Sequence, residues 1–226
     1  MKKLAILLGA VVMSGTLLAQ KPSSDDSNYS LEGMINYDNT NGVSWNAPNL
    51  RARYFVNDNI AARVTLGISS SSETMNVYEA GGNGTGTIDM ASMGWSLGLG
   101  AEYHLSGTDK LSPFFAAGIS FGGMSMTEDW ENSDGTGYNS EQTAAEKSSG
   151  SKLGFGIGAG VDYYVFDNIY IGLELGLGWD SYTDGGGSIS STEGGITTDV
   201  TTESSGSMSS LSLGGGNLGF RIGWRF

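Results

Sequence analysis

The stretch from Leu153 to Trp179, LGFGIGAGVDYYVFDNIYIGLELGLGW, decides the fold of this chain. On either side of Phe166-Asp167-Asn168, apolar side chains occupy every second position. A period of two over this length predicts a β-hairpin and not a helix. Each arm has about 11–13 residues, more than the roughly 5–6 of an ordinary strand and enough to cross a bilayer at a tilt, which takes about 9–11.

The second face of this hairpin consists mostly of glycine. A soluble β-sandwich also alternates apolar and polar residues, but it covers its outer face with charge and Thr. A glycine face suits a crowded interior instead. If lipid covers the apolar face, every backbone group must be paired within the sheet, so the pattern predicts a closed barrel.

Composition agrees with a barrel. The 226 residues are 38% hydrophobic, with a mean hydropathy of -0.14, too polar for a bundle of membrane helices but normal for strands that turn one face to the lumen. The absence of cysteine excludes disulfides, thiolate metal sites, a cysteine nucleophile and a lipid-modified cysteine anchor. His104 is the single histidine, which excludes a multi-histidine metal site. We expect no cofactor and no metal. The acidic balance, -13 at neutral pH, argues against nucleic acid as a partner.

Residues 1–19 are predicted to be a secretory signal peptide. Lys2 and Lys3 precede an apolar run from Leu4 to Val12 that is too short for a transmembrane anchor. We expect cleavage after Ala19. Leu17 is larger than the residue usually found two positions before a cleavage site, so the cleaved bond could lie a few residues away. A polar leader, residues 20–28, then precedes the barrel, residues 29–226.

The period-two pattern predicts eight strands in all. Their expected ranges are Tyr29–Tyr37, Leu50–Val56, Ile60–Ile68, Met93–Leu105, Pro113–Met124, Leu153–Val165, Ile169–Trp179 and a last strand ending at Phe226. Short turns alternate with four long polar loops, predicted at Asp38–Asn49, Ser70–Asp89, Ser125–Ser151 and Ser181–Ser210. Leu211 and Leu213 are out of phase with the last strand, so we expect a β-bulge of one extra residue within Gly214–Asn217.

Two short turns have similar sequences. Tyr54–Ile60 matches Tyr163–Ile169 at five of seven positions, and both contain Asx residues suited to tight turns. We expect the two turns to lie on the same rim of the barrel.

With its export signal, eight strands and terminal run of alternating aromatics, the chain resembles the small eight-stranded bacterial outer-membrane β-barrel family, the OmpX, OmpW and OmpA-barrel group, also called porin-like. The resemblance covers nearly all of the mature chain. It implies an all-β, antiparallel, up-and-down transmembrane barrel in the outer membrane, in contact with its lipid. It also implies a C-terminal insertion signal, read by the barrel assembly machinery, at Phe220, Ile222, Trp224 and Phe226. A monomer is expected. No peptidoglycan-binding domain follows the last strand, so no cell-wall tether is expected.

The charged residues of the predicted strands favour one register. All five arginines and four acids fall on the inner face: Glu32, Arg51, Arg53, Arg63, Glu102, Asp162, Glu174, Arg221 and Arg225. A slip of one residue would turn them to lipid, where each Arg costs about 2–4 kcal/mol near the midplane. We expect a paired polar plug in one layer near the short turns. A gate or anion site is the functional alternative, but an eight-stranded barrel is just wide enough for its own side chains. Above the plug, the inner glycines either allow a narrow barrel or leave a small cup open to the outside.

Aromatic residues on the outer face predict two interfacial girdles. They are Tyr54, Tyr103 and Tyr163 near the short turns, and Trp95, Phe121 and Trp179 toward the long loops.

The long loops carry most remaining acids, which favours solvated, mobile loops over divalent cation sites. Asn132–Gly135 lacks the final acid of an EF-hand.

Some eight-stranded barrels are lipid A acylases or deacylases, which need a His/Ser/acid set near the outer leaflet. His104 lies at the other end, so no enzymatic activity is expected. The predicted function is a structural or surface-interaction role through the outer loops, with the extracellular ligand unknown; the alternative is a narrow channel or uptake path for small or apolar solutes.

The signal peptide gives the first testable prediction. Protein isolated from the outer membrane should begin at Gln20, within a few residues, as measured by intact mass spectrometry. A mature protein that retains Lys2 and Lys3 would contradict it.

Overall fold

The computed structural model describes residues 23–38, 42–44, 50–213 and 219–226. The predicted signal peptide lies outside these ranges. Among the described residues, no helix is both long and apolar enough to cross a membrane. The strands are β1 (Tyr29–Asp38), β2 (Gly42–Ser44), β3 (Leu50–Asn57), β4 (Ile60–Tyr78), β5 (Thr85–His104), β6 (Leu111–Ser133), β7 (Tyr138–Tyr164), β8 (Ile169–Glu193), β9 (Ile196–Thr202), β10 (Ser207–Leu213) and β11 (Gly219–Arg225).

Eight of these strands form a closed antiparallel ring. The order is β8-β11-β1-β3-β4-β5-β6-β7, and β7 pairs back with β8. β2 pairs with β1, while β9 and β10 pair with β8. The all-β, eight-stranded barrel predicted from the sequence is therefore confirmed. Because the ring is closed, every strand in it has a neighbour on both sides at the level of the ring.

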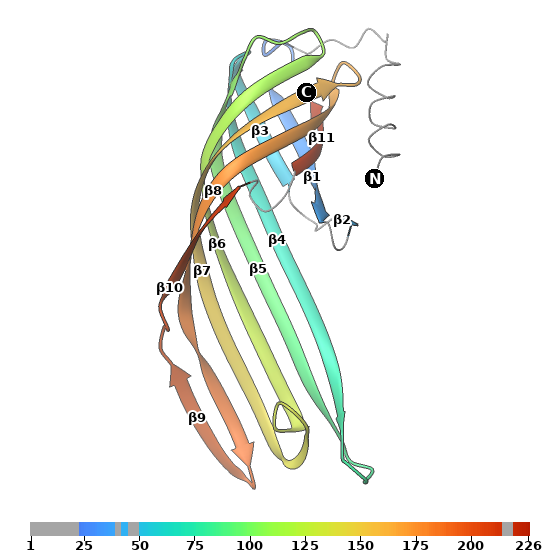
Figure 1. The fold of residues 1–226 in the computed structure, drawn as a ribbon, viewed down its shortest axis with the longest axis vertical. Coiled ribbons are helices and arrows are strands. Elements are labelled where there is room, and N and C mark those ends of the chain that lie inside the picture. The colour runs from blue at the N-terminus through green and yellow to red at the C-terminus, as the bar shows by residue number, and fades with distance from the viewer. Residues whose placement is uncertain (1–22, 39–41, 45–49, 214–218) are drawn as a thin grey trace.

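The turns that the sequence predicted to be short, β3–β4, β5–β6 and β7–β8, lie together at one end, at the top of Figure 1. They include the β3–β4 and β7–β8 turns, which the sequence predicted on one rim, and the C-terminus lies beside them. In the β3–β4 turn the Asn57 side-chain oxygen accepts hydrogen bonds from the backbone N–H groups of Asn59 and Ile60, each at 2.9 Å. This Asx hydrogen bonding is the local reason that the sequence turns there.

The prediction of long loops at the other end was wrong at three of four places, and the fourth, Asp38–Asn49, lies largely outside the described residues. Residues predicted as loops at Ser70–Asp89, Ser125–Ser151 and Ser181–Ser210 are mostly strand, continuing β4 to β8 and forming β9 and β10. The β6–β7 hairpin keeps regular pairing out to Glu131↔Thr143, and after a register shift it ends at Ser133↔Tyr138. Once the barrel fixes the register of two adjacent strands, each further residue pair adds hydrogen bonds without a new loop to close. The segments were predicted to be loops because they are rich in Ser and Gly, but such a composition indicates polarity and says nothing about strand pairing.

These extensions form a sheet that projects beyond the ring, drawn at the bottom of Figure 1. We call this part, residues 70–91, 125–147 and 186–202, the protruding sheet. It contains its own small core, because Ile88 and Ala144 are buried there. In the β6–β7 turn the Asp134 carboxylate accepts hydrogen bonds from the Thr136 hydroxyl and from the backbone N–H groups of Thr136 and Gly137, which lower the pKa of Asp134.

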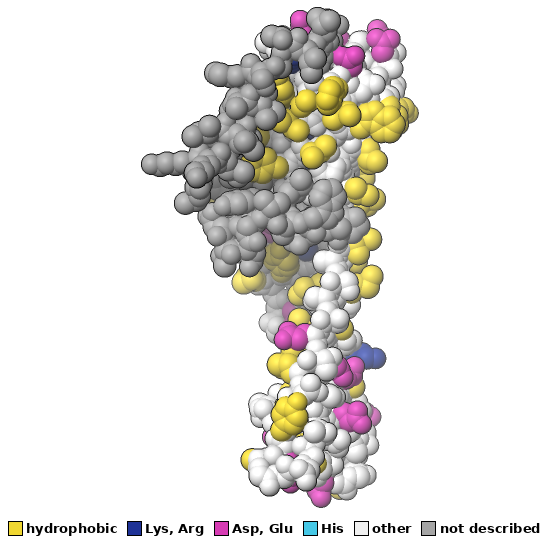
Figure 2. Space-filling view, turned by 90° about the vertical axis from the view of Figure 1, so that its right-hand side faces the viewer, with side chains coloured by type: hydrophobic (Ala, Val, Ile, Leu, Met, Phe, Trp, Pro, Cys, Tyr) yellow, Lys and Arg dark blue, Asp and Glu magenta, His cyan; other side chains and the backbone are white. Residues whose placement is uncertain are grey.

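Most apolar residues point outward along the ring, whereas a few, such as Phe55 and Phe114, are buried inside it. Side chains such as Leu66, Ile157 and Leu175 are more than half exposed. Figure 2 shows hydrophobic side chains gathered over the wider upper part of the molecule, with acidic ones at its top end and along the narrow protruding sheet. This division agrees with a lipid-covered ring and a solvated extension.

The strands β10 and β11 both pair with β8. The β-bulge predicted at Gly214–Asn217 falls on residues outside the described ranges and stays a prediction. On either side of those residues, Leu213 pairs with Leu177 and Gly219 with Glu174.

The protruding sheet gives a second prediction. Deleting residues 128–146 and closing Thr127 to Lys147 with Asn-Gly should leave the barrel folded, because these two residues face each other across the hairpin and a two-residue turn fits such a pair. Heat-modifiable mobility on a gel measures folding of the ring. Loss of that mobility would mean that the ring depends on the extension.

Candidate functional site

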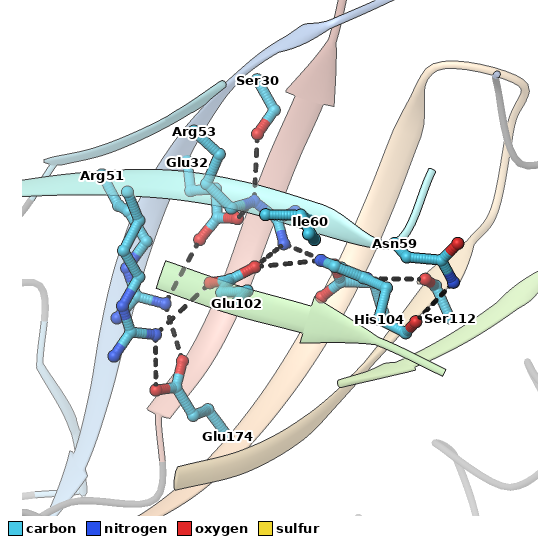
Figure 3. Close-up of polar contacts among 12 residues, drawn as sticks. Ser30, Glu32, Arg51, Arg53, Asn59, Ile60, Glu102, His104, Ser112 and Glu174 are labelled. Atoms are coloured by element: carbon cyan, nitrogen blue, oxygen red, sulfur yellow. Dashed lines mark hydrogen bonds and ion pairs between the residues drawn. The ribbon is translucent and has the colours of Figure 1, made fainter. Parts of the chain in front are cut away.

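The charged residues of the lumen meet in one buried network, which we call the lumen network (Figure 3). Arg53 lies at its centre and contacts three carboxylates. Its guanidinium atoms are 2.7 Å from Glu32, 2.8 Å from Glu102 and 2.8 Å from Asp162. The Arg53 side chain is fully buried, so none of these contacts is shared with bulk water.

Arg221 on β11 joins the network from the other side of β1. It lies 2.8 Å from Asp162, 3.2 Å from Glu32 and 3.5 Å from Glu174. Its guanidinium passes over Gly172, where a Cβ would lie 2.8 Å from Arg221 and from Asp162. A larger residue at position 172 would therefore push this ion pair apart.

Arg51 and Arg63 share Glu174 at the outer side of the network. Arg51 is 2.7 Å from Glu174 and Arg63 is 2.9 Å from it. Arg63 also reaches Glu102 at 3.3 Å, and Arg51 reaches Glu32 at 3.7 Å. This layer is less buried, since the side chains of Arg63 and Glu174 are 15% exposed.

The lumen network is electrically balanced. It holds four arginines and four carboxylates: Arg51, Arg53, Arg63, Arg221, Glu32, Glu102, Asp162 and Glu174. These eight come from seven of the eight ring strands, all except β6. Burying an unpaired charge is costly, whereas a paired and hydrogen-bonded set is tolerated. Each carboxylate has at least two arginine partners, so the loss of one arginine weakens the ion pairs of several carboxylates.

The ninth predicted member, Arg225, lies outside the network. It has no carboxylate partner among the described ion pairs. Its guanidinium stacks 3.8 Å from the centroid of Phe55, donates to the Ser27 carbonyl at 2.7 Å and to the Tyr164 hydroxyl at 3.4 Å. The predicted nine-residue plug is thus corrected to eight charges plus one arginine in an aromatic layer.

This aromatic layer lies in the lumen on the short-turn side of the charges and was not predicted as part of the site. Its rings are Phe55, Phe114, Tyr164 and Tyr170, each 0–1% exposed. Tyr170 donates a hydrogen bond to Glu32 at 2.7 Å, and its ring centroid lies 4.9 Å from the Arg53 guanidinium. Gly223 makes room for it, since a Cβ there would lie 2.0 Å from the Tyr170 ring. The inner positions of the strands next to the short turns are the sequence signal that locates such a layer.

Ser112, His104 and Glu102 form a Ser–His–acid chain, but the two ring nitrogens of His104 are exchanged relative to those of a serine hydrolase. His104 Nδ1 is 2.9 Å from the Ser112 hydroxyl, and Nε2 is 3.1 Å from Glu102. All three residues are at most 2% exposed, and Glu102 is also bound by Arg53. A nucleophile needs access to a substrate. The arrangement therefore acts as a link between the network and the short-turn end of β6.

Comparisons with known proteins agree with this architecture. The outer membrane protein beta-barrel domain family matches residues 6–226. The chain belongs to this family. Among solved structures, a major outer membrane protein from Thermus thermophilus is similar, with a TM-score of 0.46, 13% identity and coverage of 88% of this chain and 99% of that one. Ail, the attachment invasion locus protein of Yersinia pestis, has a TM-score of 0.37 and 14% identity, covering 88% and 97%. No curated protein matches the chain.

Family membership places the barrel in the outer membrane, and outward aromatic residues lie toward both ends of the ring, as predicted for interfacial girdles. Near the short turns Tyr54, Tyr103 and Trp224 are 42–54% exposed. Toward the protruding sheet Trp95 is 54% exposed and Phe121 39%, while Trp179 stacks on Phe155 at 5.3 Å. Tyr163 is half-buried on the same outer face. Two levels of outward rings are what interfacial girdles of a barrel require.

The C-terminal strand of this outer membrane barrel has its aromatic face turned outward. Phe220, Ile222, Trp224 and Phe226 are 37–54% exposed. Phe226 stacks with Tyr29 at 6.2 Å, and its backbone exchanges two hydrogen bonds with Tyr29. The last residues therefore close the ring against the first strand.

The lumen network gives a third prediction. Arg53→Ala should destabilise the barrel by about 3–5 kcal/mol, because it leaves three buried carboxylates without their central partner. Arg225→Ala is the matched control and should cost less, since it removes an aromatic contact and no carboxylate partner. Equilibrium urea unfolding in lipid vesicles measures both. Equal losses for the two variants would contradict the central role of Arg53.

Proposed function

We propose that this outer membrane protein has a closed lumen and acts through its protruding sheet. The observation that supports a closed lumen is the balanced lumen network stacked on the buried aromatic layer, with Arg53, Arg221 and Phe114 each 1% exposed. An eight-stranded barrel has little spare width. A path for ions would have to break several ion pairs at once.

The protruding sheet offers a surface for a partner. Beyond Leu66, β4 pairs only with β5 among the described strands, since the β3 pairing ends at Leu50↔Leu66. Such an edge presents unpaired N–H and C=O groups to which an extended segment of another protein can add. The sheet is strongly acidic, with Glu128, Asp129, Glu131 and Glu146 near the single Lys147. A basic, extended partner segment fits this surface best.

A narrow channel or uptake path for small or apolar solutes is the second candidate. Its supporting observation is a cavity on the outer side of the lumen network, lined by residues of six strands and of the segment before β10. The cavity lining includes none of the lumen network, so conduction would require the network to open.

Further proposals concern assembly and chemistry. The outward aromatic face of β11 suits recognition by the barrel assembly machinery, and the closed ring suits a monomer. Because Ser112, His104 and Glu102 are buried, we propose no catalytic activity.

The surface role gives a fourth prediction. Cells of a non-adherent strain that express the full chain should bind surfaces coated with extended basic peptides more than cells that express the variant lacking residues 128–146. The shortened variant keeps the ring and so serves as its own control for export and abundance. Equal attachment by the two strains would show that the acidic β6–β7 extension takes no part in binding.

A further inference from the structure

A cavity of about 800 Å³ lies on the lumenal face at the base of the protruding sheet. The inner glycines were expected either to allow a narrow barrel or to leave a small cup open to the outside. The cavity shows that a cup is present on the outer side of the lumen network. Its innermost row runs through Gly67, Ser96, Gly122, Lys152 and Tyr182, which are aligned by strand register. Its volume falls within the range of about 300–1,000 Å³ that holds small molecules.

The wall of the cavity is built from residues with little or no side chain. Gly67, Gly94, Gly122 and Gly150 contribute one inner position each from β4 to β7. The residues between them are largely serine. The space therefore results from the sequence itself and not from a missing contact between elements.

Three methionines line the outer part of the cavity. Met124, Met126 and Met208 are 58%, 46% and 69% exposed. Met124 and Met126 lie on the lumenal face, because they pair with inner-facing Gly94 and Ser92. Methionine is flexible and polarizable and adapts to varied apolar ligands. Apolar side chains exposed within a concave polar surface indicate a place where an apolar group binds.

One cation stands at the base of this apolar surface. Lys152 is the one Lys or Arg among the described residues that line the cavity. Its amine lies 3.0 Å from Asp180 and 5.3 Å from the centroid of the Tyr182 ring, which hold it in place. An ammonium has three donors, and the side chain of Lys152 remains 32% exposed. The acid at the rim, Asp184, is instead held by its own loop, through Gly186 and Ser205.

The strands that border the cavity leave it an open side. The part of β4 beyond the ring pairs only with β5, and β10 pairs only with β8, among the described strands. Gly67 and Ser69 of β4 and Met208 of β10 nevertheless line the same cavity. The cavity lies at the level of Trp95, which is in the outer girdle and is also a lining residue. A molecule from the outer leaflet therefore has a short way in.

We propose that this cavity binds a single-chain amphiphile with an anionic head group, such as a medium-chain fatty acid. The carboxylate binds Lys152, and the chain lies along Met124, Met126 and Met208. The site is distinct from the surface role of the protruding sheet, and because it ends at the outer side of the lumen network it binds without conducting.

The test uses the mature protein refolded in lipid nanodiscs, since a detergent is itself a single-chain amphiphile. Radiolabelled laurate is titrated against protein-containing and empty nanodiscs. The expected result is one saturable site per protein above the empty-disc baseline. No saturable component would overturn the proposal.

Two pairs of probes locate the site and its head-group contact. Ser69→Leu projects into the cavity and should weaken laurate binding at least tenfold, whereas Ser70→Leu, on the outer face of the same strand, should not. Lys152→Gln combined with Asp180→Asn removes the cation without leaving a bare carboxylate. This variant should weaken laurate binding about tenfold and leave dodecanol binding unchanged. Equal laurate binding by Ser69→Leu and Ser70→Leu would place the ligand on the lipid-facing surface and overturn the proposal. Butyrate, which has the carboxylate but almost no chain, is used as a competitor. If butyrate displaces laurate as well as unlabelled laurate does, the cavity is an anion site alone, and the proposal is overturned.

Discussion

The contact of Arg53 with three carboxylates is the interaction on which the rest of the structure depends. Because Arg53, Glu32, Glu102 and Asp162 lie on four different strands, their pairing holds distant parts of the ring at one register. A slip of one residue on any of these strands would turn a charge to lipid and leave its partners bare. The same contacts lie within the lumen, so the residues that stabilise the ring also occupy the space inside it.

Beyond this layer, on the side away from the short turns, the molecule changes its character. The strands β4 to β8 continue far past the ring, while β1, β3 and β11 are short. The result is a wall that is high on one side, with an edge along β4. The closed ring can tolerate such an edge because the lumen network already fixes the strands within it. Glycine and serine at the inner positions then leave space where the ring would otherwise be filled.

Much of this could be predicted from the sequence. The alternation in Leu153–Trp179 predicts the strands. Placing Arg51, Arg53 and Arg63 on the inner face predicts the register, because the opposite register would expose these side chains to lipid at a high cost in free energy. Family membership and the structure agree with both. Arg225 was misplaced since a strand pattern gives the face of a side chain but not its height or partner. Arg225 instead contacts the aromatic side chains of Phe55 and Tyr164, and these contacts join strands that are far apart in the sequence.

The extensions were missed for a different reason. Ser-rich segments such as Ser125–Ser151 carry no apolar alternation, and only the register inherited from the barrel makes them strands. Closure of the barrel by the lumen network is tested by single-channel recording of the refolded wild-type protein in a planar bilayer. If the lumen is closed, the bilayer stays silent. Steady ion-selective current steps from the wild-type protein would show that the lumen is open.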